Sequence, residues 1–312
     1  MSATIVIGPY SETDLAALND AFAPTFLASP ADLAGLDAAT REGATAVAFK
    51  GHNAFGGEAM DLLPNIGLIA NFGVGYDAID VKAADARGIK VTNTPDVLND
   101  DVADLAVALL LMRGREMEHA TNWARSGQWK GKGEYRLNRK VSGGKAGIVG
   151  LGRIGREIAN RLVAFKMDIH YFARSEKETS GWTYHADPVS LAKEVDYLIV
   201  ALVGGPDTVN FVSAEVLDAL GPRGIIVNIS RGSTIDEEAL LDALEQDKIY
   251  GAALDVYLNE PDINPRFYAL DNVVLQPHQG SGTVETRAAM AKLQRDNLVA
   301  YHAKEPLLTP VN

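Results

Sequence analysis

One hexapeptide constrains the fold of this chain more than any other feature. Residues 150–155 read Gly-Leu-Gly-Arg-Ile-Gly and match the spacing G-x-G-x-x-G. The apolar run Ala146–Val149 precedes them, and Arg153–Phe165 follows with helical periodicity. Glycine makes up 29 of the 312 residues, so the hexapeptide alone is a weak signal. Its place between a strand and a helix makes the signal strong, and Lys145–Arg174 is therefore predicted to form a βαβ unit that binds a dinucleotide.

Each position of the hexapeptide has a physical reason. Gly150 permits the tight turn, Gly152 lets the backbone approach a pyrophosphate, and Gly155 allows the helix to pack closely on the strand. The helix begins at Arg153 and Ile154, where unpaired N–H groups and the helix dipole attract phosphate. These five residues are predicted to bind the cofactor.

The end of the second strand discriminates between the two nicotinamide cofactors. An NAD site usually carries an acidic residue there, which binds the ribose 2′-hydroxyl. Here Asp168–Phe172 is followed by Ala173, Arg174 and Ser175, and the next acid is Glu176. An arginine and a hydroxyl can pair with a 2′-phosphate that a carboxylate would repel. NADP(H) is therefore predicted over NAD(H), with a solvated surface arginine as the alternative interpretation.

Apolar runs alternate with helical patterns along the rest of the chain, which predicts parallel βαβ units. The predicted strands are Ile5–Gly8, Ala46–Phe49, Leu68–Ala70, Lys90–Val91, Ala146–Val149, Asp168–Phe172, Tyr197–Ala201, Ile225–Asn228, Gly251–Val256 and Val273–Gln276. The predicted helices include Glu12–Phe22, Ala59–Leu63, Val102–Met112 with N-cap candidates at 99–101, and Val284–Lys304. A glycine-rich basic loop is expected over Ser126–Gly144. The last helix is left over after a complete strand series and is expected to pack on the first domain.

Three polar residues follow three of the apolar strands. Arg231 comes after Ile225–Asn228, Glu260 after the Gly251 strand, and His278 after the Val273 strand. Ligands of open α/β sheets bind outside the carboxyl ends of the strands, so these side chains are expected at one edge. A lone arginine or histidine is usually structural, but their joint placement favours a catalytic set.

That set suits the reduction of a 2-keto acid. Arg231 can bind a carboxylate and a carbonyl oxygen in a forked geometry. His278 can protonate the carbonyl oxygen as hydride reaches the carbon, and Glu260 beside it would favour the charged imidazolium. No metal is expected to take part.

The chain resembles the D-isomer-specific 2-hydroxyacid dehydrogenase family over nearly its whole length. The resemblance is carried by Asn71–Asp77, Asn93–Pro95, Gly147–Gly155, Asn228–Gly232, Asp255–Pro261 and Pro277–Ser281. Within the family, residues 93–104 and Gly204-Gly205-Pro206 look like the glyoxylate/hydroxypyruvate and hydroxyphenylpyruvate reductases.

The resemblance implies two doubly wound α/β domains. A flavodoxin-like substrate domain would combine residues 1–98 and 283–312, and a Rossmann cofactor domain would span 99–282. It also implies a homodimer, the catalytic set Arg231, Glu260 and His278, and backbone N–H groups of Val74 and Gly75 that bind the substrate carboxylate. Further residues are expected at the cofactor, namely Pro206, Asp255 and Gly280.

Three functions stay open at this point. The first is NADPH-dependent reduction of a small 2-keto acid such as glyoxylate or hydroxypyruvate. The second is reduction of an aromatic 2-keto acid such as hydroxyphenylpyruvate, since pocket size is not readable from the sequence. The third belongs to another class: the same fold serves transcriptional corepressors that sense a dinucleotide and bind protein partners.

Composition limits the partners and the compartment. The formal net charge of −12 argues against nucleic acid as a partner. The longest strongly apolar stretch, Leu105–Met112, is too short to span a bilayer, so no membrane partner is expected. The chain has no cysteine, which excludes disulfides and weakly favours a cytoplasmic location.

Overall fold

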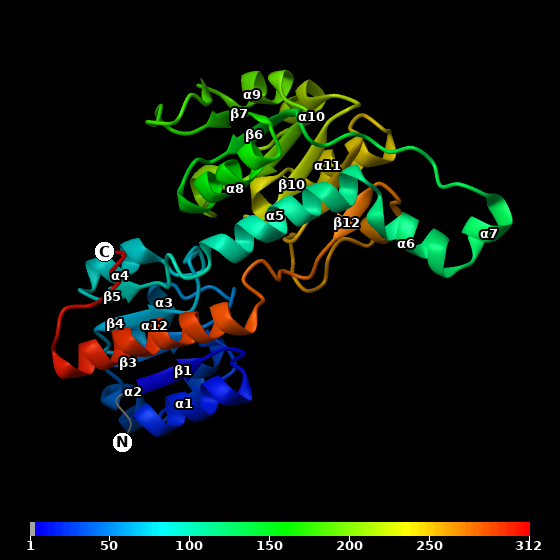
Figure 1. The fold of residues 1–312 in the computed structure, drawn as a ribbon. Coiled ribbons are helices and arrows are strands. Elements are labelled where there is room, and N and C mark those ends of the chain that lie inside the picture. Colours follow the sequence, from blue (N-terminus) through cyan, green and yellow to red (C-terminus); the bar gives the residue numbers. More distant parts are fainter. Residues whose placement is uncertain (1–3) are drawn as a thin grey trace. The chain divides into compact units, whose positions relative to one another are not determined.

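The structure is a computed structural model that describes residues 4–312; Met1–Ala3 lie outside the described residues. The chain divides into two compact units, one built from the residues up to Leu98 together with Val284–Asn312, the other from Asn99–Thr283. Each unit is a parallel sheet with helices on both faces (Figure 1). The predicted fold class, two doubly wound α/β domains, is confirmed.

The first unit contains a five-stranded sheet in the order β2-β1-β3-β4-β5, with every pairing parallel. This is the flavodoxin-like order. Its strands are β1 (Thr4–Ile7), β2 (Thr25–Leu27), β3 (Ala46–Phe49), β4 (Leu68–Asn71) and β5 (Lys90–Thr92).

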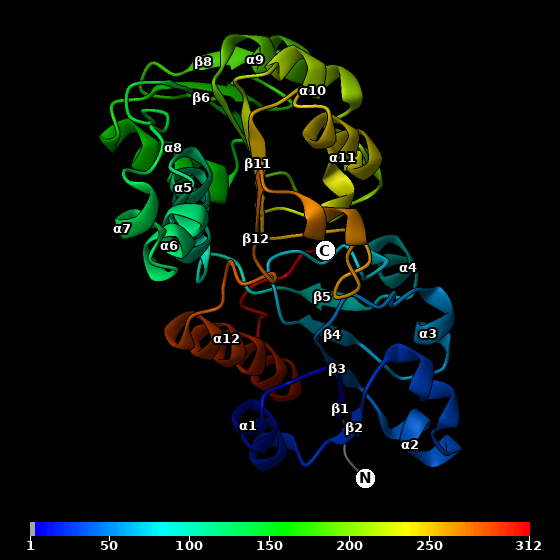
Figure 2. The ribbon, with the colours of Figure 1, turned by 90° about the vertical axis from the view of Figure 1, so that its right-hand side faces the viewer.

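Helices from both ends of the chain cover this sheet. They are α1 (Glu12–Phe22), α2 (Ala38–Gly43), α3 (Gly57–Asp61), α4 (Val81–Ala86), the 3₁₀ turn η1 (Pro30–Gly35) and α12 (Val284–Ala303). Figure 2 shows α1 and α12 on one face and α2, α3 and α4 on the other. Leu298 of α12 packs in an apolar cluster with Val6, Ala48 and Ala70. The Gln294 side chain donates to the backbone carbonyls of Phe49 and Ala70, which fixes α12 along the sheet.

The second unit contains a seven-stranded sheet in the order β12-β11-β10-β9-β6-β7-β8, again with every pairing parallel. Its strands are β6 (Lys145–Val149), β7 (Asp168–Phe172), β8 (Thr183–His185), β9 (Tyr197–Val200), β10 (Ile225–Asn228), β11 (Gly251–Leu254) and β12 (Val273–Leu275). The strand order reverses between β6 and β9. Ligands of such sheets bind beyond the carboxyl ends of the strands at this reversal.

Helices cover both faces of the seven-stranded sheet as well. They are α5 (Asn99–Gly114), α6 (Met117–Arg125), α7 (Gln128–Lys132), α8 (Arg153–Ala164), α9 (Pro188–Glu194), α10 (Ala214–Leu220) and α11 (Glu237–Glu245). Short 3₁₀ turns join them, η2 (Pro206–Thr208), η3 (Gly232–Thr234) and η4 (Pro265–Ala269). Figure 2 shows α5 and α8 on one face and α9, α10 and α11 on the other.

Several local predictions were wrong. Asn99 begins α5, so residues 99–101 form its first turn and do not cap it from outside. The expected loop over 126–144 contains the short helix α7. The edge strands β2 and β8 were missed, because each has three residues and lacks a buried apolar run.

Among the helices of residues 4–312, none is both long and apolar enough to cross a membrane.

Candidate active site

The turn between β6 and α8 has the shape that a pyrophosphate needs. Gly150 has a φ of +103°, and a Cβ there would lie 2.7 Å from the carbonyl oxygen of Ala201. A Cβ on Gly155 would overlap the carbonyl oxygen of Gly150, whereas one on Gly152 would meet open space. Two glycines are thus required by close packing, and the third leaves room beside the start of α8. The residues present therefore fit the phosphates of a dinucleotide.

The other residues expected at the cofactor lie after strands on either side of the β6–β9 reversal. Arg174 and Ser175 are exposed and begin the loop that follows β7. Pro206 begins η2 in the loop that follows β9, where the Thr208 hydroxyl donates to the carbonyl of Val203. These positions agree with the strand order, and the contacts with a cofactor stay a prediction.

Arg231 is held by a tight turn at the end of β10. The Asn228 side chain donates to the Arg231 carbonyl at 2.9 Å, and the Thr234 hydroxyl donates to the same oxygen at 2.6 Å. Gly232 follows directly, and a Cβ there would overlap the backbone carbonyl of Tyr257. The turn that presents Arg231 therefore packs on the segment that carries Glu260, three residues after Tyr257.

The side chains of Glu260 and His278 form a short hydrogen bond. His278 Nδ1 lies 2.6 Å from Glu260 Oε2, and the two side chains are 31% and 21% exposed. The other oxygen, Glu260 Oε1, accepts from the backbone N–H of Tyr257 at 2.8 Å. Both glutamate oxygens are thus engaged, and the ring of His278 is held through Nδ1.

The backbone of His278 is strained and is braced by Asp255. His278 has a φ of +51°, a left-handed conformation that is uncommon outside glycine. Its N–H donates to the Asp255 carbonyl, and the Asp255 carboxylate accepts from the N–H groups of Gln279 and Gly280, all at 2.8 Å. Burial raises the pKa of Asp255. The hydrogen bonds from these two N–H groups and the nearby His278 act in the opposite direction but do not outweigh burial. Asp255 and Gly280, expected at the cofactor, are thus bonded to each other.

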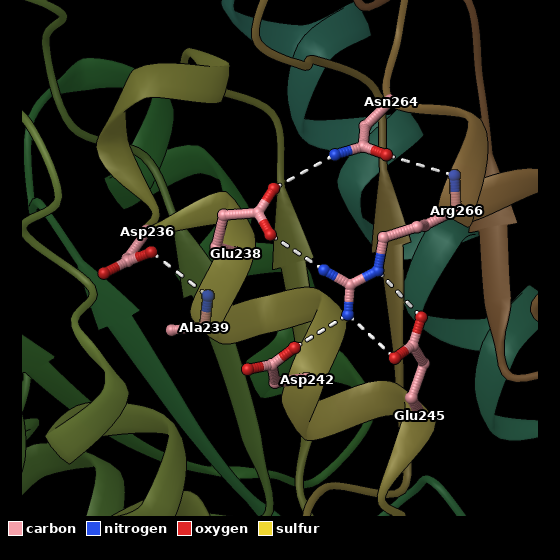
Figure 3. Close-up of polar contacts among 7 residues, drawn as sticks. All are labelled: Asp236, Glu238, Ala239, Asp242, Glu245, Asn264 and Arg266. Carbon is pink, nitrogen blue, oxygen red and sulfur yellow. Dashed lines mark hydrogen bonds and ion pairs between the residues drawn. The ribbon is translucent and has the colours of Figure 1, made fainter.

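Helix α11 is bonded to Asn264 and Arg266, which follow Glu260 in the chain (Figure 3). Arg266 in η4 contacts three carboxylates of the helix, Glu238 at 2.8 Å, Asp242 at 2.7 Å and Glu245 at 2.7 Å. Asn264 donates to Glu238, and the neighbouring Glu237 accepts from the backbone N–H of Leu258. These contacts attach residues on both sides of Glu260 to one helix.

Val74 and Gly75 belong to the five-stranded unit, in the loop that follows β4. The Asn93 side chain donates to the Val74 carbonyl, and the Asn71 side chain donates to the carbonyls of Gly73 and Gly75, at 2.9–3.1 Å. Side chains of the unit thus fix the orientation of this loop. That its N–H groups bind a substrate carboxylate stays a prediction.

The chain is similar in sequence to proteins of one known family. Residues 107–280 match the family model of the NAD-binding domain of D-isomer specific 2-hydroxyacid dehydrogenases. A hydroxyphenylpyruvate reductase of Plectranthus scutellarioides is 46% identical over 254 residues, 81% of each chain. A glyoxylate/hydroxypyruvate reductase of Arabidopsis thaliana is 47% identical over 249 residues, 80% of this chain and 79% of the other. The chain belongs to the D-isomer specific 2-hydroxyacid dehydrogenase family.

Solved structures agree with this assignment. An NADPH-dependent glyoxylate/hydroxypyruvate reductase from Sinorhizobium meliloti, in complex with NADP and malonate, is 42% identical, with a TM-score of 0.94. The match covers 100% of this dehydrogenase and 97% of that chain. The protein is thus an NAD(P)-dependent oxidoreductase, and reduction of 2-keto acids is the activity that its relatives share.

Some contacts that shape the site of this dehydrogenase were not predicted from the sequence, although Asp255 itself was expected at the cofactor. The bonds from Asp255 to the His278 loop and the network around Arg266 join residues more than 20 positions apart. A partial signal existed, since Asp255 is an acid directly after a fully apolar strand, where an unpaired carboxylate would be costly. The Arg266 network had none, because surface charges give no pattern that names their partners.

Proposed function

We propose that this dehydrogenase reduces a small 2-keto acid, with glyoxylate and hydroxypyruvate as the first candidates, to the D-2-hydroxy acid. The observation that carries the proposal is the 2.6 Å pair of His278 and Glu260 at the carboxyl edge of the seven-stranded sheet. A histidine that is oriented through Nδ1 by a carboxylate can serve as the general acid that a carbonyl reduction requires.

The residues divide the reaction between them. When bound, the reduced nicotinamide supplies the hydride that reaches the carbonyl carbon. His278 gives the proton from Nε2 to the carbonyl oxygen, which becomes the hydroxyl. Glu260 holds the ring through Nδ1 and stabilises its charged form. Arg231 binds the substrate carboxylate in a fork and offsets the negative charge on the oxygen, a contribution that is large where water is excluded.

NADP(H) is the cofactor that we propose. Arg174 and Ser175 stand where an NAD site would carry an acid, and both are exposed in the structure. A guanidinium and a hydroxyl offer hydrogen bonds to a 2′-phosphate. The name of the Sinorhizobium meliloti relative, NADPH-dependent, supports the same choice.

The homodimer and the cytoplasmic location stay predictions. Large apolar side chains on and after α7 support the dimer: Trp129 is 65% exposed and Leu137 is 99% exposed. Figure 1 shows α6 and α7 standing away from the seven-stranded sheet, where a second copy could cover them.

A panel of 2-keto acids tests the function. Purified enzyme is assayed by NADPH absorbance with glyoxylate, hydroxypyruvate and hydroxyphenylpyruvate, and we expect the first two to give the higher kcat/KM. Preference for hydroxyphenylpyruvate would favour the aromatic substrate, for which the Plectranthus scutellarioides relative is named. Tight NADPH binding with no turnover of any 2-keto acid would contradict the proposal.

Two variants test the roles of the site residues. We expect Arg231→Ala and His278→Ala each to lower kcat/KM by at least about 100-fold, with cofactor binding retained in His278→Ala. Arg223→Ala, at an exposed arginine before β10, is the matched control and should keep full activity. Full activity in His278→Ala would refute its role as the acid.

A further inference from the structure

The loop between β7 and β8 is irregular in backbone but anchored at several points. Residues 173–182 contain no helix or strand, and Arg174, Ser175, Glu176 and Lys177 are all exposed. An exposed loop of this length is usually mobile and contributes little to recognition unless something fixes it. The contacts of the loop therefore decide whether its polar side chains can act together.

One anchor is the hydroxyl of Tyr171 in β7. The Tyr171 side chain is 1% exposed, and its hydroxyl accepts from the backbone N–H of Lys177 at 2.9 Å and donates to the Lys177 carbonyl at 3.0 Å. A single hydroxyl thus fixes both backbone polar groups of one loop residue. A phenylalanine would fill the same core space, so packing alone does not account for the hydroxyl.

A second anchor lies just after Lys177. Arg156 of α8 donates to the carbonyl of Glu178 at 3.2 Å, and its guanidinium lies 5.8 Å from the centre of the Trp182 ring. The Thr179 hydroxyl oxygen accepts from the backbone N–H of Trp182 at 3.2 Å. Lys177 is therefore held between the sheet on one side and α8 on the other.

The Lys177 side chain points back along the loop toward the residues proposed to meet the cofactor. Its Nζ donates to Ser175 Oγ at 3.4 Å, so the ammonium and the hydroxyl lie together directly after Arg174. A phosphate monoester carries a charge of about −1.5 to −2 at pH 7 and three acceptor oxygens. Such a group needs several donors from different directions, and Glu176 in the same stretch makes a second cation more necessary.

We propose that Lys177 is a third donor to the cofactor 2′-phosphate, beside Arg174 and Ser175, and that Tyr171 is the residue that positions it. The inference rests on the proposed preference for NADP(H). It makes cofactor choice depend on a buried hydroxyl in the sheet, which holds the backbone from which Lys177 extends.

Binding of two cofactor fragments tests the inference without turnover. Calorimetry measures the affinity for 2′,5′-ADP, which carries the phosphate, and for 5′-AMP, which lacks it. We expect Lys177→Ala to lower the ratio of the two affinities about ten-fold, the scale of one charge-assisted hydrogen bond. Tyr171→Phe should lower the ratio about three-fold, because Lys177 stays present but is less well placed. Lys177→Arg should restore most of the ratio.

Two control variants remove comparable groups elsewhere in the same unit. Tyr197→Phe removes a hydroxyl that donates to the Lys140 carbonyl at 3.2 Å from a tyrosine that is also 1% exposed. Tyr197 begins β9 and pairs with Ala146 near the start of β6, so it lies at the other end of the strands from the cofactor turn. Lys193→Ala removes an exposed lysine of α9. Both should leave the ratio of affinities unchanged.

Kinetics with the two cofactors gives a second measurement. The ratio of kcat/KM for NADPH over NADH should fall in Lys177→Ala and Tyr171→Phe in the same order as the binding ratio. An unchanged ratio in both variants, or an equal effect of Tyr171→Phe and Tyr197→Phe, would overturn the inference, as would equal wild-type affinity for the two fragments. Stronger binding of 2′,5′-ADP without turnover of any 2-keto acid would instead contradict the proposed reaction and leave Lys177 in its role.

Discussion

The segment from Asp255 to His278 contributes to two clusters of charged and ionisable side chains. The clusters differ in exposure to solvent and in the role that we propose for them. Glu260 pairs with His278 through side chains that are 21% and 31% exposed. Arg266 makes three ion pairs, with carboxylates that are 42–70% exposed (Figure 3). The network around Arg266 holds the backbone after Glu260, whereas the pair of Glu260 and His278 is proposed to take part in proton transfer. The number of ion pairs is therefore a poor measure of what a cluster contributes to function.

The physical difference is the surrounding water. Exposed pairs are screened by solvent and salt, and each contributes little. A pair that is partly withdrawn from water interacts more strongly, and breaking it leaves a charge without compensation. Variants of the two sites should therefore differ in the size of their effects on rate and in their response to salt.

Glu260→Gln should have the largest effect. Glutamine can still accept from the Tyr257 N–H, but a neutral amide does not stabilise the charged imidazolium of His278. We expect kcat/KM at pH 7.5 to fall about 100-fold. Glu238→Gln, in the exposed site, is the matched control and should change the rate less than about two-fold. Equal effects of the two substitutions would abolish the contrast.

Asp255→Asn should have an intermediate effect. Its amide oxygen can still accept from one of the two N–H groups, of Gln279 or Gly280, but the amide nitrogen would face the other. We expect kcat to fall about ten-fold and the free energy of unfolding to fall by about 1–3 kcal/mol, the cost of an unsatisfied buried group. Denaturant titration measures the stability, with Asp218→Asn on the exposed face of α10 as the control. Wild-type stability would show that Asp255 does not brace the His278 loop.

Arg266→Gln should have the smallest effect on rate, less than about two-fold, and a modest effect on Tm. The hydrogen bond from Arg266 holds the pKa of Glu245 below its ordinary value of 4.5. A carboxylate with a lowered pKa stabilises the fold above the unfolded value and loses that contribution as the pH falls. The Tm difference from wild type should therefore be present at pH 7, shrink below about pH 4.5, and shrink again in high salt. A Tm difference that changes with neither pH nor salt would mean that Arg266 stabilises the fold by packing and not by its charge.

The sequence predicted the sheets better than their edges. Runs such as Ile225–Asn228 are apolar on both faces, because helices cover both sides, and this pattern is visible without a structure. The edge strand Thr183–His185 is half exposed and has no such pattern, since its residues pair with one neighbouring strand. Helix α7 was missed because Gly131 lies within it and glycine disfavours helix.

The same limit applies to the site. Arg231, Glu260 and His278 could be proposed because the strand rule places residues that follow parallel strands at one edge. The bond from Tyr171 to Lys177 and the brace from Asp255 could not, because each depends on a side chain reaching the backbone of a loop. Loop paths are set by such contacts and not by periodicity, so the sequence shows which residues are near and leaves open how they are held.

The division of the first unit between the two ends of the chain also determines the order in which its parts are synthesised. Residues up to Leu98 leave the ribosome early, whereas α12 emerges nearly 200 residues later. Helix α12 carries Leu298, which packs on Val6, and Gln294, which donates to the Ala70 carbonyl. The apolar face of the nascent five-stranded sheet that α12 covers therefore stays exposed to solvent while the seven-stranded unit is translated. Such an interval is when chaperones bind and aggregation begins. A chain that ended before Val284 would contain every residue of the seven-stranded unit but would lack α12, so the five-stranded sheet would keep one apolar face uncovered.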